Sequence, residues 1–486
     1  MQTLFAGVLA VFGFAPFGLF PLAVIALLVL FRVWLRSGSA AQAARAGFTF
    51  GMGLFSFGVG WVYVALHDYG YMHPLLAIGA TLLFAALIST PLALAGYVLL
   101  RFRTAESVRV LLLMPALWVL AEWLRGLMFT GFPWLAFGYS QVPDSPLSGY
   151  APLFGVYGVS LAVAVSAAAL LFVVHVRGSA AGKIALGGVT ALWLFGGALQ
   201  HVAWTQPNGE PLKVSLLQGN IPQDEKFTEE RLVSSLETYR RLAQSSDARL
   251  IIMPETALPL LRHNVPPYYQ QLLRDHVRQN GGDILIGVFE KEGERYFNSV
   301  YSLGSADSQH YRKDHLVPFG EFIPMRGVLG WIINEVLQIP MGDLTSGGDA
   351  QAPLDVAGQK VAVNICYEDV FGEEIIRPLP QATLLVNVTN DAWYGESNAA
   401  VQHNQMSQMR ALETGRMMLR ATNTGVTSVI GIDGQVLAQL PQHEEGVLTA
   451  EVQGYAGSTP YVRWGNVAIL LVLALMLAAA VKFSRR

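Results

Sequence analysis

The sequence has little charge and almost no cysteine. Charged residues make up 14% of the 486 positions and hydrophobic residues 52%, whereas ordinary soluble domains carry roughly 25% charged residues. The formal net charge of -3 provides no basic surface, which argues against nucleic-acid binding. The only cysteine, Cys366, excludes an intramolecular disulfide and any metal site built from several thiolates. We therefore expect a chain that lies largely in lipid, with one thiol that is either inert packing or used in chemistry.

The sequence also lacks the short motifs of common cofactor sites. It has no HExxH spacing, no glycine-rich phosphate loop and no dinucleotide fingerprint. The histidines His310, His315 and His403 are too scattered to form a metal site, and none has a cysteine partner. We therefore expect no cofactor and no metal.

Long apolar segments gather before residue 201 and again at the C-terminus. A helix needs about 20 residues to cross the hydrocarbon core, and by this measure about seven segments precede a more polar insert and one follows it. The segments centre on Leu4–Pro16, Pro21–Leu35, Phe48–Leu66, Pro74–Leu100, Val110–Leu127, Pro152–Val176, Ile184–His201 and Val467–Val481. The sequence predicts a polytopic α-helical membrane domain over residues 1–205 and a C-terminal transmembrane helix over residues 465–482.

The basic residues of the N-terminal half fall in alternate loops. They are Arg32, Arg36, Arg45, Arg101, Arg103, Arg109, Arg177 and Lys183, with Arg125 out of pattern. Cytoplasmic loops are enriched in Lys and Arg, so both termini are expected in the cytoplasm and the insert outside, in the periplasm of a bacterium. We interpret Arg125 as a local ion pair with Glu122, three residues earlier, and contact with a lipid phosphate is the alternative.

Residues 213–453 have the composition of a globular α/β domain that is long enough to bury its own core. Short apolar runs predict strands, and Glu229–Ala243 predicts an amphipathic helix. The predicted strands are Val214–Leu217, Leu250–Met253, Ile284–Val288, Val361–Ile365, Leu384–Val388 and Val426–Ile430. A helix face of methionines is expected from Met406, Met409, Met417 and Met418.

Three strand-like runs end in reactive residues: Glu255, Lys313 and Cys366. Each residue has an ordinary alternative. Glu255 would suit a helix N-terminus after Pro254, Lys313 a solvated surface, and Cys366 a buried apolar position. Catalytic groups gather at the carboxyl ends of strands in open α/β sheets, so the combination favours a shared site.

A thiol, a carboxylate and an ammonium together can make and use a thiolate near neutral pH, where a free thiol is mostly protonated. Glu255 would take the thiol proton as general base, and Lys313 would stabilise negative charge. The backbone N–H of Tyr367 would be a second donor to an oxyanion, and Glu321 would orient the ammonium of Lys313.

The strand ends Glu255, Lys313 and Cys366 resemble the catalytic triad of the carbon-nitrogen hydrolase, or nitrilase, superfamily, whose fold is an αββα sandwich. Longer phrases resemble the apolipoprotein N-acyltransferases in order and spacing over essentially the whole chain. These phrases are Gln218–Gln223, Pro254–Ala257, Lys313–Phe322, Ile365–Glu368, Asn390–Gly395, Glu122–Gly126 and Thr130–Trp134.

The resemblance implies an enzyme that moves an acyl chain from a phospholipid to the N-terminal amine of a diacylglyceryl-cysteine lipoprotein, through a thioester on Cys366. It also assigns supporting active-site roles, which fall on Asn298, Glu321, Tyr367 and Glu368. We expect a monomer. Where the family often has tryptophan after Lys226, this chain has Phe227, which keeps an apolar platform but lacks the indole N–H.

Aromatic loops are expected near the membrane surface, where Trp and Tyr are enriched. The loops Phe129–Tyr139, with Trp134, and Asp391–Tyr394, with Trp393 and Tyr394, would line a lipid path or serve as interfacial anchors.

Two other functions remain open. A membrane-tethered amidase or nitrilase would use the same three residues and pass the acyl group to water. A transporter would use the insert only to bind a ligand, although the membrane half shows neither clear repeats nor intramembrane charges typical of transporters.

Overall fold

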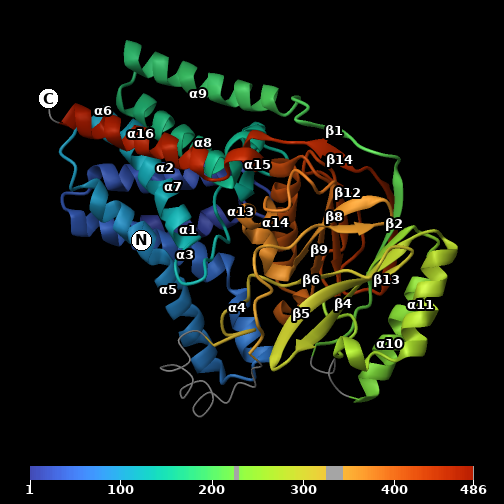
Figure 1. Ribbon diagram of the computed structural model, residues 1–486. Helices are drawn as coiled ribbons and strands as arrows, with labels where there is room; N and C mark the ends of the chain where they lie inside the picture. The colour runs from blue at the N-terminus through green and yellow to red at the C-terminus, as the bar shows by residue number, and fades with distance from the viewer. Residues whose placement is uncertain (224–228, 324–342, 485–486) are drawn as a thin grey trace. The chain divides into compact units, whose positions relative to one another are not determined.

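The computed structural model describes residues 1–223, 229–323 and 343–484 and separates into two compact units (Figure 1). Unit 1 comprises residues 1–63, 73–203 and 459–486, and unit 2 comprises residues 64–72 and 204–458. Phe227 lies outside the described residues. The segment 64–72, which precedes most of the apolar helices in sequence, thus belongs to the unit that carries the sheets.

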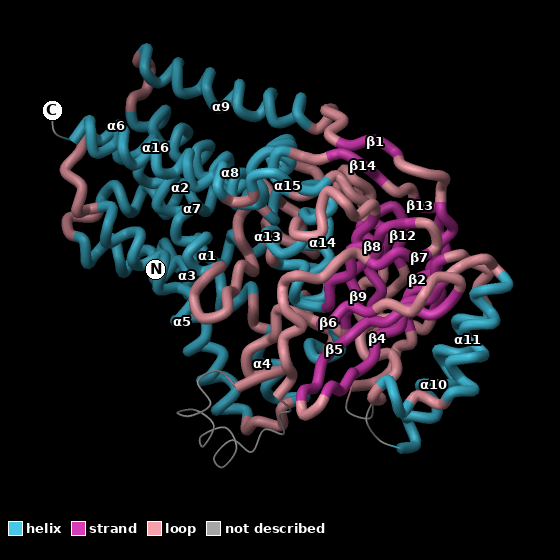
Figure 2. Tube along the Cα trace, in the orientation of Figure 1, coloured by secondary structure: helices cyan, strands magenta, loops and turns pink. Residues whose placement is uncertain are grey.

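Unit 1 is built of helices, and a helix lies at every predicted apolar segment (Figure 2). Ser39 and Ser179 cap α3 and α9 by accepting backbone N–H groups, and Pro21 and Pro74 begin α2 and α5. The helices are α1 (Gln2–Val11), α2 (Pro21–Arg36), α3 (Ala40–Gly58), α4 (Trp61–Val64), α5 (Pro74–Leu99), α6 (Glu106–Val108), α7 (Met114–Arg125), α8 (Ala151–His175), α9 (Ala180–Leu199), α15 (Pro460–Trp464) and α16 (Val467–Ser484).

Not every apolar helix of unit 1 is long enough to span a bilayer alone. Among the described residues, 4 helical segments meet the length and composition of a span, and the bent pair Ala40–Gly58 and Trp61–Tyr69 would make up to 5. The spans are Pro74–Leu99, Glu106–Arg125, Pro146–His175 and Ala180–Leu199. The helices Gln2–Val11 and Val467–Phe483 are apolar but shorter. The larger number of crossings expected from the sequence stays a prediction.

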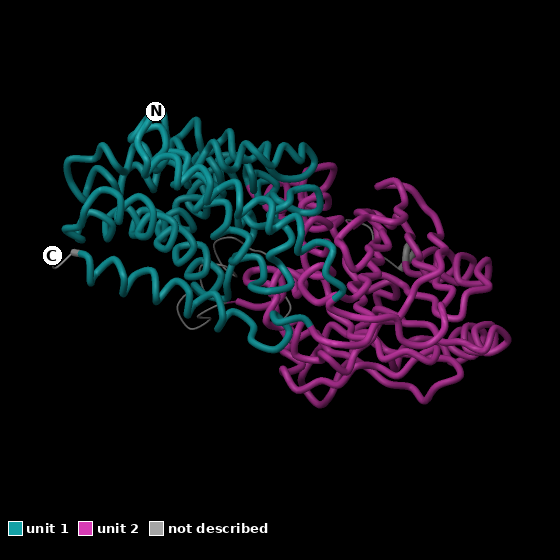
Figure 3. Tube along the Cα trace, turned by 90° about the horizontal axis from the view of Figure 1, so that it is seen from above, with its two compact units in different colours: residues 1–63, 73–203, 459–486 teal, residues 64–72, 204–458 magenta. Residues whose placement is uncertain are grey.

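Unit 2 (magenta in Figure 3) contains two 6-stranded sheets. The first has the order β13-β2-β3-β4-β5-β6 and the second β12-β11-β10-β9-β8-β7. The centre of each sheet is parallel, β2 to β4 in the first and β8 to β10 in the second, and the other pairs are antiparallel. The first sheet consists of β2 (Leu212–Gln218), β3 (Leu250–Ile252), β4 (Asp283–Glu292), β5 (Arg295–Gly304), β6 (His310–Arg312) and β13 (Gly446–Val452). The second consists of β7 (Leu354–Val356), β8 (Gln359–Ile365), β9 (Leu384–Thr389), β10 (Met418–Thr422), β11 (Ser428–Ile430) and β12 (Val436–Gln439). A separate pair joins β1 (Thr205–Pro207) to β14 (Tyr455–Gly457).

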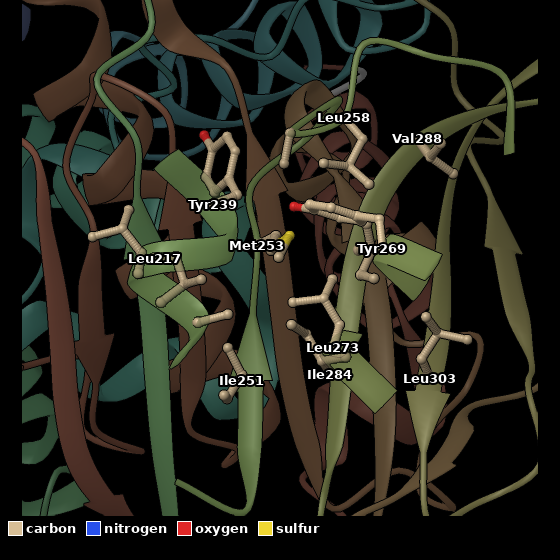
Figure 4. Close-up of a cluster of buried hydrophobic side chains, with 14 of the residues drawn as sticks. Leu217, Tyr239, Ile251, Met253, Leu258, Tyr269, Leu273, Ile284, Val288 and Leu303 are labelled. Atoms are coloured by element: carbon tan, nitrogen blue, oxygen red, sulfur yellow. The ribbon is translucent and has the colours of Figure 1, made fainter. Parts of the chain in front are cut away.

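Helices cover the sheets on their outer faces. On the first sheet, α10 (Glu229–Gln244) and α11 (Pro267–Gln279) bury Tyr239 and Leu273 against Ile251 and Ile284 (Figure 4). On the second sheet, α14 (Ala399–Thr414) packs on β10 and β11, while β2 contacts β10 between the sheets. Burial of these apolar faces is the main stabilising contribution. The αββα sandwich expected from the resemblance is confirmed.

The six strands predicted from apolar runs coincide with β2, β3, β4, β8, β9 and β11, and the predicted amphipathic helix with α10. The predicted methionine face is wrong in part. Met406 and Met409 lie on α14. Gly415, whose φ is 62°, ends this helix, and Met418 begins the strand β10. Glycine tolerates this left-handed conformation at a helix end, so the chain turns from helix to strand between the two methionine pairs.

Candidate active site

Three strand ends of unit 2 bring Glu255, Lys313 and Cys366 into one buried region. Glu255 follows β3, Lys313 follows β6, and Cys366 follows β8 in the other sheet. The residues are 7%, 1% and 9% exposed. The region thus lies where the two sheets meet, at carboxyl ends of strands, as expected for an α/β site.

Glu255 is held from both sheets. Its Oε1 accepts a hydrogen bond of 2.7 Å from the side-chain amide of Asn298 on β5, and its Oε2 accepts one of 2.9 Å from the backbone N–H of Asn390, just after β9. Residues 255–258 form turns and bends, so Glu255 is not at a helix N-terminus. A carboxylate fixed through both oxygens has one orientation, which suits a proton acceptor.

Lys313 is a buried ammonium between two carboxylates. Its Nζ lies 2.9 Å from Glu321 and 3.8 Å from Glu255. Burial favours the neutral amine, but the nearby acidic groups, Glu321 first, outweigh burial and raise the pKa of Lys313 above its ordinary value. Lys313 therefore carries a permanent positive charge inside the protein, and the solvated alternative is wrong.

Cys366 has an unusual backbone conformation. The backbone angle φ of Cys366 is 54°, and the residue begins a short 3-10 helix, Cys366–Val370, directly after β8. Few residues with a side chain adopt this left-handed region, and where they do the surrounding structure holds them there. Burial raises the pKa of the thiol, Glu255 raises it further, and Lys313 opposes both. The resting group is therefore a thiol, which needs a base to become a nucleophile.

The other predicted supporting residues surround these three. The side-chain amide of Asn298 donates to Glu255 and, at 3.2 Å, to Glu321, so it lies between the two carboxylates and binds both. The ring of Tyr367 lies edge-on to Phe371 with centroids 5.2 Å apart.

Glu368 connects the Cys366 turn to the segment after Lys313. It accepts backbone N–H groups from Ile365 at 2.6 Å, Asp314 at 2.6 Å and His315 at 3.1 Å, and the Tyr311 hydroxyl lies 3.0 Å away. Burial raises the pKa of Glu368 to about 8 although these backbone donors favour the carboxylate. Glu368 thus joins the backbone at the end of β8 to the backbone just after Lys313.

The aromatic residues predicted for the lipid loops have different surroundings. Trp393 is 44% exposed on the 3-10 helix Asp391–Tyr394, and its ring lies edge-on to Tyr69 with centroids 6.2 Å apart. Tyr394 is half-buried on the same turn. Trp134, in unit 1, is only 1% exposed and packs on Trp61 with ring centroids 5.0 Å apart.

Glu122 and Arg125 hold the backbone of the following loop. Glu122 accepts the N–H of Phe137 at 2.8 Å, and Arg125 donates to the carbonyl groups of Phe132 and, at 2.6 Å, Trp134. The expected local ion pair is therefore an incomplete description of these two side chains.

The sequence did not identify a second set of buried charged residues next to Cys366: Asp369, Asp391, His403 and Arg420. A signal was present, because charged residues in apolar segments must find partners when buried. Across the residues that the structure describes, no group of three His, Cys, Asp or Glu side chains could hold a metal ion.

Comparison with known proteins covers both parts of the chain. Residues 6–169 match the family described as apolipoprotein N-acyltransferase N-terminal domain, and residues 213–461 match carbon-nitrogen hydrolase. A CN-hydrolase superfamily protein of Xanthomonas campestris is similar with a TM-score of 0.39 and 18% identity, over 55% of this chain and 97% of that one.

Full-length relatives have one name in common. The chain is 52% identical to the apolipoprotein N-acyltransferase of Nitrosomonas europaea, over 97% of this chain and 95% of that protein. It is 45% identical to the apolipoprotein N-acyltransferase of Methylococcus capsulatus, over 96% and 92%. Since these matches extend through both the apolar helices and the sheets, the protein is a bacterial membrane enzyme that belongs to the apolipoprotein N-acyltransferase family.

Proposed function

We propose that this protein N-acylates the N-terminal diacylglyceryl-cysteine of lipoproteins, takes the acyl chain from a phospholipid, and carries it as a thioester on Cys366. The observation that carries the proposal is the buried Glu255, fixed by Asn298 and Asn390, with the Lys313 ammonium 3.8 Å from it and a thiol whose pKa responds to both. A thiol, a base and a cation form the minimum set for acyl transfer through a thiolate.

In the first step, Cys366 Sγ attacks the ester carbonyl carbon of the phospholipid. Glu255 takes the thiol proton as the C–S bond forms, and it returns this proton to the glycerol oxygen when the C–O bond breaks. The products are an acyl thioester on Cys366 and a lysophospholipid.

In the second step, the N-terminal amine of the lipoprotein attacks the thioester carbonyl. Glu255 accepts the amine proton, the C–S bond breaks, and the sulfur takes the proton back. An amide is formed and the enzyme returns to its resting thiol, which is the ping-pong scheme of covalent catalysis.

The oxyanion of each tetrahedral intermediate needs donors. Lys313 supplies a charged one and the backbone N–H of Tyr367 a second. Glu321 orients Lys313, while Asn298 and Glu368 keep the strand ends together. These are positioning roles, since each acts through another residue.

The membrane setting follows from the substrates, whose acyl tails stay in lipid. The alternation of basic loops supports cytoplasmic termini and a periplasmic sheet unit in the inner membrane, and we propose a monomer. Trp393 and Tyr394, with Phe227, would line the paths of the lipids, whereas Trp134 is too buried for this role.

Purified protein with phospholipid and a synthetic diacylated lipopeptide tests the proposal. We expect a triacylated peptide and a lysophospholipid in equal amounts, and neither with Cys366→Ala. Release of free fatty acid alone would instead establish the membrane-tethered amidase, in which water replaces the amine. Unchanged transfer in Cys366→Ala would remove the thioester from the scheme.

A further inference from the structure

Four buried charged side chains form a closed ring next to Cys366. His403 Nε2 lies 2.7 Å from Asp369 Oδ1, and His403 Nδ1 lies 2.9 Å from Asp391 Oδ1. Arg420 closes the ring, with one nitrogen 3.0 Å from Asp369 Oδ2 and the other 3.0 Å from Asp391 Oδ2. The side chains are 0% to 2% exposed. We call Asp369, Asp391, His403 and Arg420 the charge ring.

The geometry of the charge ring assigns its protonation state. A neutral imidazole has one N–H, whereas both ring nitrogens of His403 face a carboxylate oxygen. Both must donate, so His403 is an imidazolium. Burial and Arg420 favour the neutral ring, but Asp369 and Asp391 outweigh them and raise the pKa of His403. Two cations and two carboxylates then cancel, which is the condition for burying charge.

The charge ring holds the carbonyl oxygen of Cys366. His403 Nε2 lies 3.3 Å from this oxygen, and the side-chain amide of Asn387 donates to it at 3.1 Å. Asn387 is itself fixed because its Oδ1 accepts a hydrogen bond of 2.8 Å from Arg420. The Asn387 amide therefore donates to the carbonyl of the residue whose φ is 54°, and the single N–H on His403 Nε2, which donates to Asp369 at 2.7 Å, is shared with this carbonyl at 3.3 Å. Contacts of this kind can keep a left-handed backbone in place.

The carbonyl of Cys366 and the N–H of Tyr367 belong to the same planar peptide group. Because the peptide is rigid, fixing the oxygen also fixes the direction of the N–H, which points the opposite way. We propose that the charge ring, together with Asn387, is a positioning network that aims the Tyr367 N–H at the oxyanion. This inference rests on the proposed role of Cys366. It adds Asn387, His403 and Arg420, which lie outside the strand-end motifs, to Asp369 and Asp391, which adjoin or lie within them.

Two reactions of the single thiol distinguish a loss of oxyanion positioning from a general loss of folded structure. Alkylation by iodoacetamide needs a reactive sulfur but forms no oxyanion. Acylation by a p-nitrophenyl fatty-acid ester needs the sulfur and also stabilises an oxyanion. Since the chain has one cysteine, both adducts are read at Cys366 without background.

Asn387→Ala and His403→Gln are compared with the parent protein in full-length, detergent-solubilised form. We expect acylation to fall by about tenfold to 10²-fold in both variants, since loss of one oxyanion donor costs up to about 10³-fold, while alkylation changes by less than about threefold. Arg416→Met is the matched control. Arg416 is 1% exposed and donates to the carbonyl groups of Ala382 at 2.8 Å and Gly457 at 2.9 Å. Thermal unfolding of each variant measures how far it remains folded, and either of the two variants suffices if the other does not fold.

Each outcome either supports or overturns the positioning network. An equal fall of alkylation and acylation, or unchanged acylation, in Asn387→Ala and His403→Gln would overturn the positioning network while the proposed function stands. The same split between the two reactions in Arg416→Met would also overturn it. A parent protein that is alkylated but never acylated would overturn the proposed function, and this inference with it.

Discussion

The ammonium of Lys313 lies 2.9 Å from both carboxylate oxygens of Glu321. The ammonium of Lys313 lies farther from Glu255, at 3.8 Å, so we assign Glu321 as the carboxylate that positions it. In the proposed mechanism, this arrangement would let Lys313 neutralise Glu321 at rest and still present its charge to the reacting atoms. The longer distance to Glu255 would leave that carboxylate free to accept a proton.

Lys313→Arg should therefore lose most transfer activity. The planar guanidinium is broader than the ammonium and has a different donor geometry, so retained charge does not restore the contact with Glu321. We expect a decrease in kcat of about 10²-fold, the scale of losing one oxyanion donor. Initial rates of lipopeptide acylation measure the effect.

Lys360→Arg is the matched control, because Lys360 is 54% exposed and pairs with Asp355 at 3.3 Å on the surface. Its rate should equal that of the parent. Near-parental turnover in Lys313→Arg would show that a compact ammonium is not required.

Asn298→Ala should impair the base without unfolding the site. It removes the 2.7 Å donor to Glu255 and the 3.2 Å donor to Glu321, so the two carboxylates are no longer held apart by one amide. We expect acyl-enzyme formation to slow by at least about tenfold, because an unpositioned base loses much of its contribution. Single-turnover measurements with excess enzyme report this step. Asn398→Ala, at an exposed position before α14, should keep the parental rate, and an equal effect of both variants would contradict the role of Asn298.

The Cys366 thiol should react slowly near neutral pH. Burial and Glu255 raise its pKa, so the thiolate fraction increases as pH rises and no plateau is expected across the neutral range. The rate of iodoacetamide labelling should therefore rise about tenfold per pH unit, following the thiolate fraction. Mass spectrometry at several pH values measures the profile. A rate that is already constant from weakly acidic pH upward would mean a resting thiolate and would remove the need for Glu255 in the first proton transfer.

The charge ring should make the free energy of unfolding fall both at acid pH, through Asp391, and at higher pH, through His403. Although burial opposes it, His403 and Arg420 lower the pKa of Asp391 from 3.8 to about 2. The stability contributed by Asp391 is therefore present above its unfolded value and lost as pH falls through about 2. The raised pKa of His403 acts oppositely: its contribution is present below the ordinary 6.5 and lost as pH rises through the raised value.

Asp391→Asn should lower the midpoint of thermal unfolding at neutral pH, since removing one partner of a buried pair costs about 3–5 kcal/mol. It should also weaken the loss of stability on the acid side. Asp355→Asn, whose parent side chain is 67% exposed, serves as the surface control and should change little. Identical pH profiles for the parent and Asp391→Asn would contradict the buried charge ring.

The strand ends were predictable because the apolar runs of β3 and β8 are followed by charged residues. Pro254 and Glu255 follow Leu-Ile-Ile-Met, and Glu368 and Asp369 come soon after Val-Ala-Val-Asn-Ile, and such a change of polarity marks a boundary. Cys366 itself is no such signal, because a thiol also suits a buried strand position. The strand β10 was not predictable in the same way, because its start at Met418 continues the methionines of α14. Only the left-handed Gly415 separates the two elements.

The need for partners was visible in the sequence, but the pairing within the charge ring was not predictable, because its four members come from four separate segments of the chain. Asp369 and Arg420 are 51 positions apart, and His403 and Asp369 are 34 apart. Pairings at such separations depend on the order of strands in the second sheet, which hydrophobic periodicity does not reveal. For the same reason, the sequence identified Asn298 through the family resemblance but gave no hint of Asn387.

Trapping the thioester tests the central claim most directly. The purified protein is treated with phospholipid in the absence of any lipopeptide and analysed intact and after proteolysis. We predict one added acyl chain, located on the peptide that contains Cys366, released by neutral hydroxylamine and transferred when the diacylated lipopeptide is added. An acyl chain on another residue, or full transfer activity with no hydroxylamine-sensitive adduct at Cys366, would contradict the account.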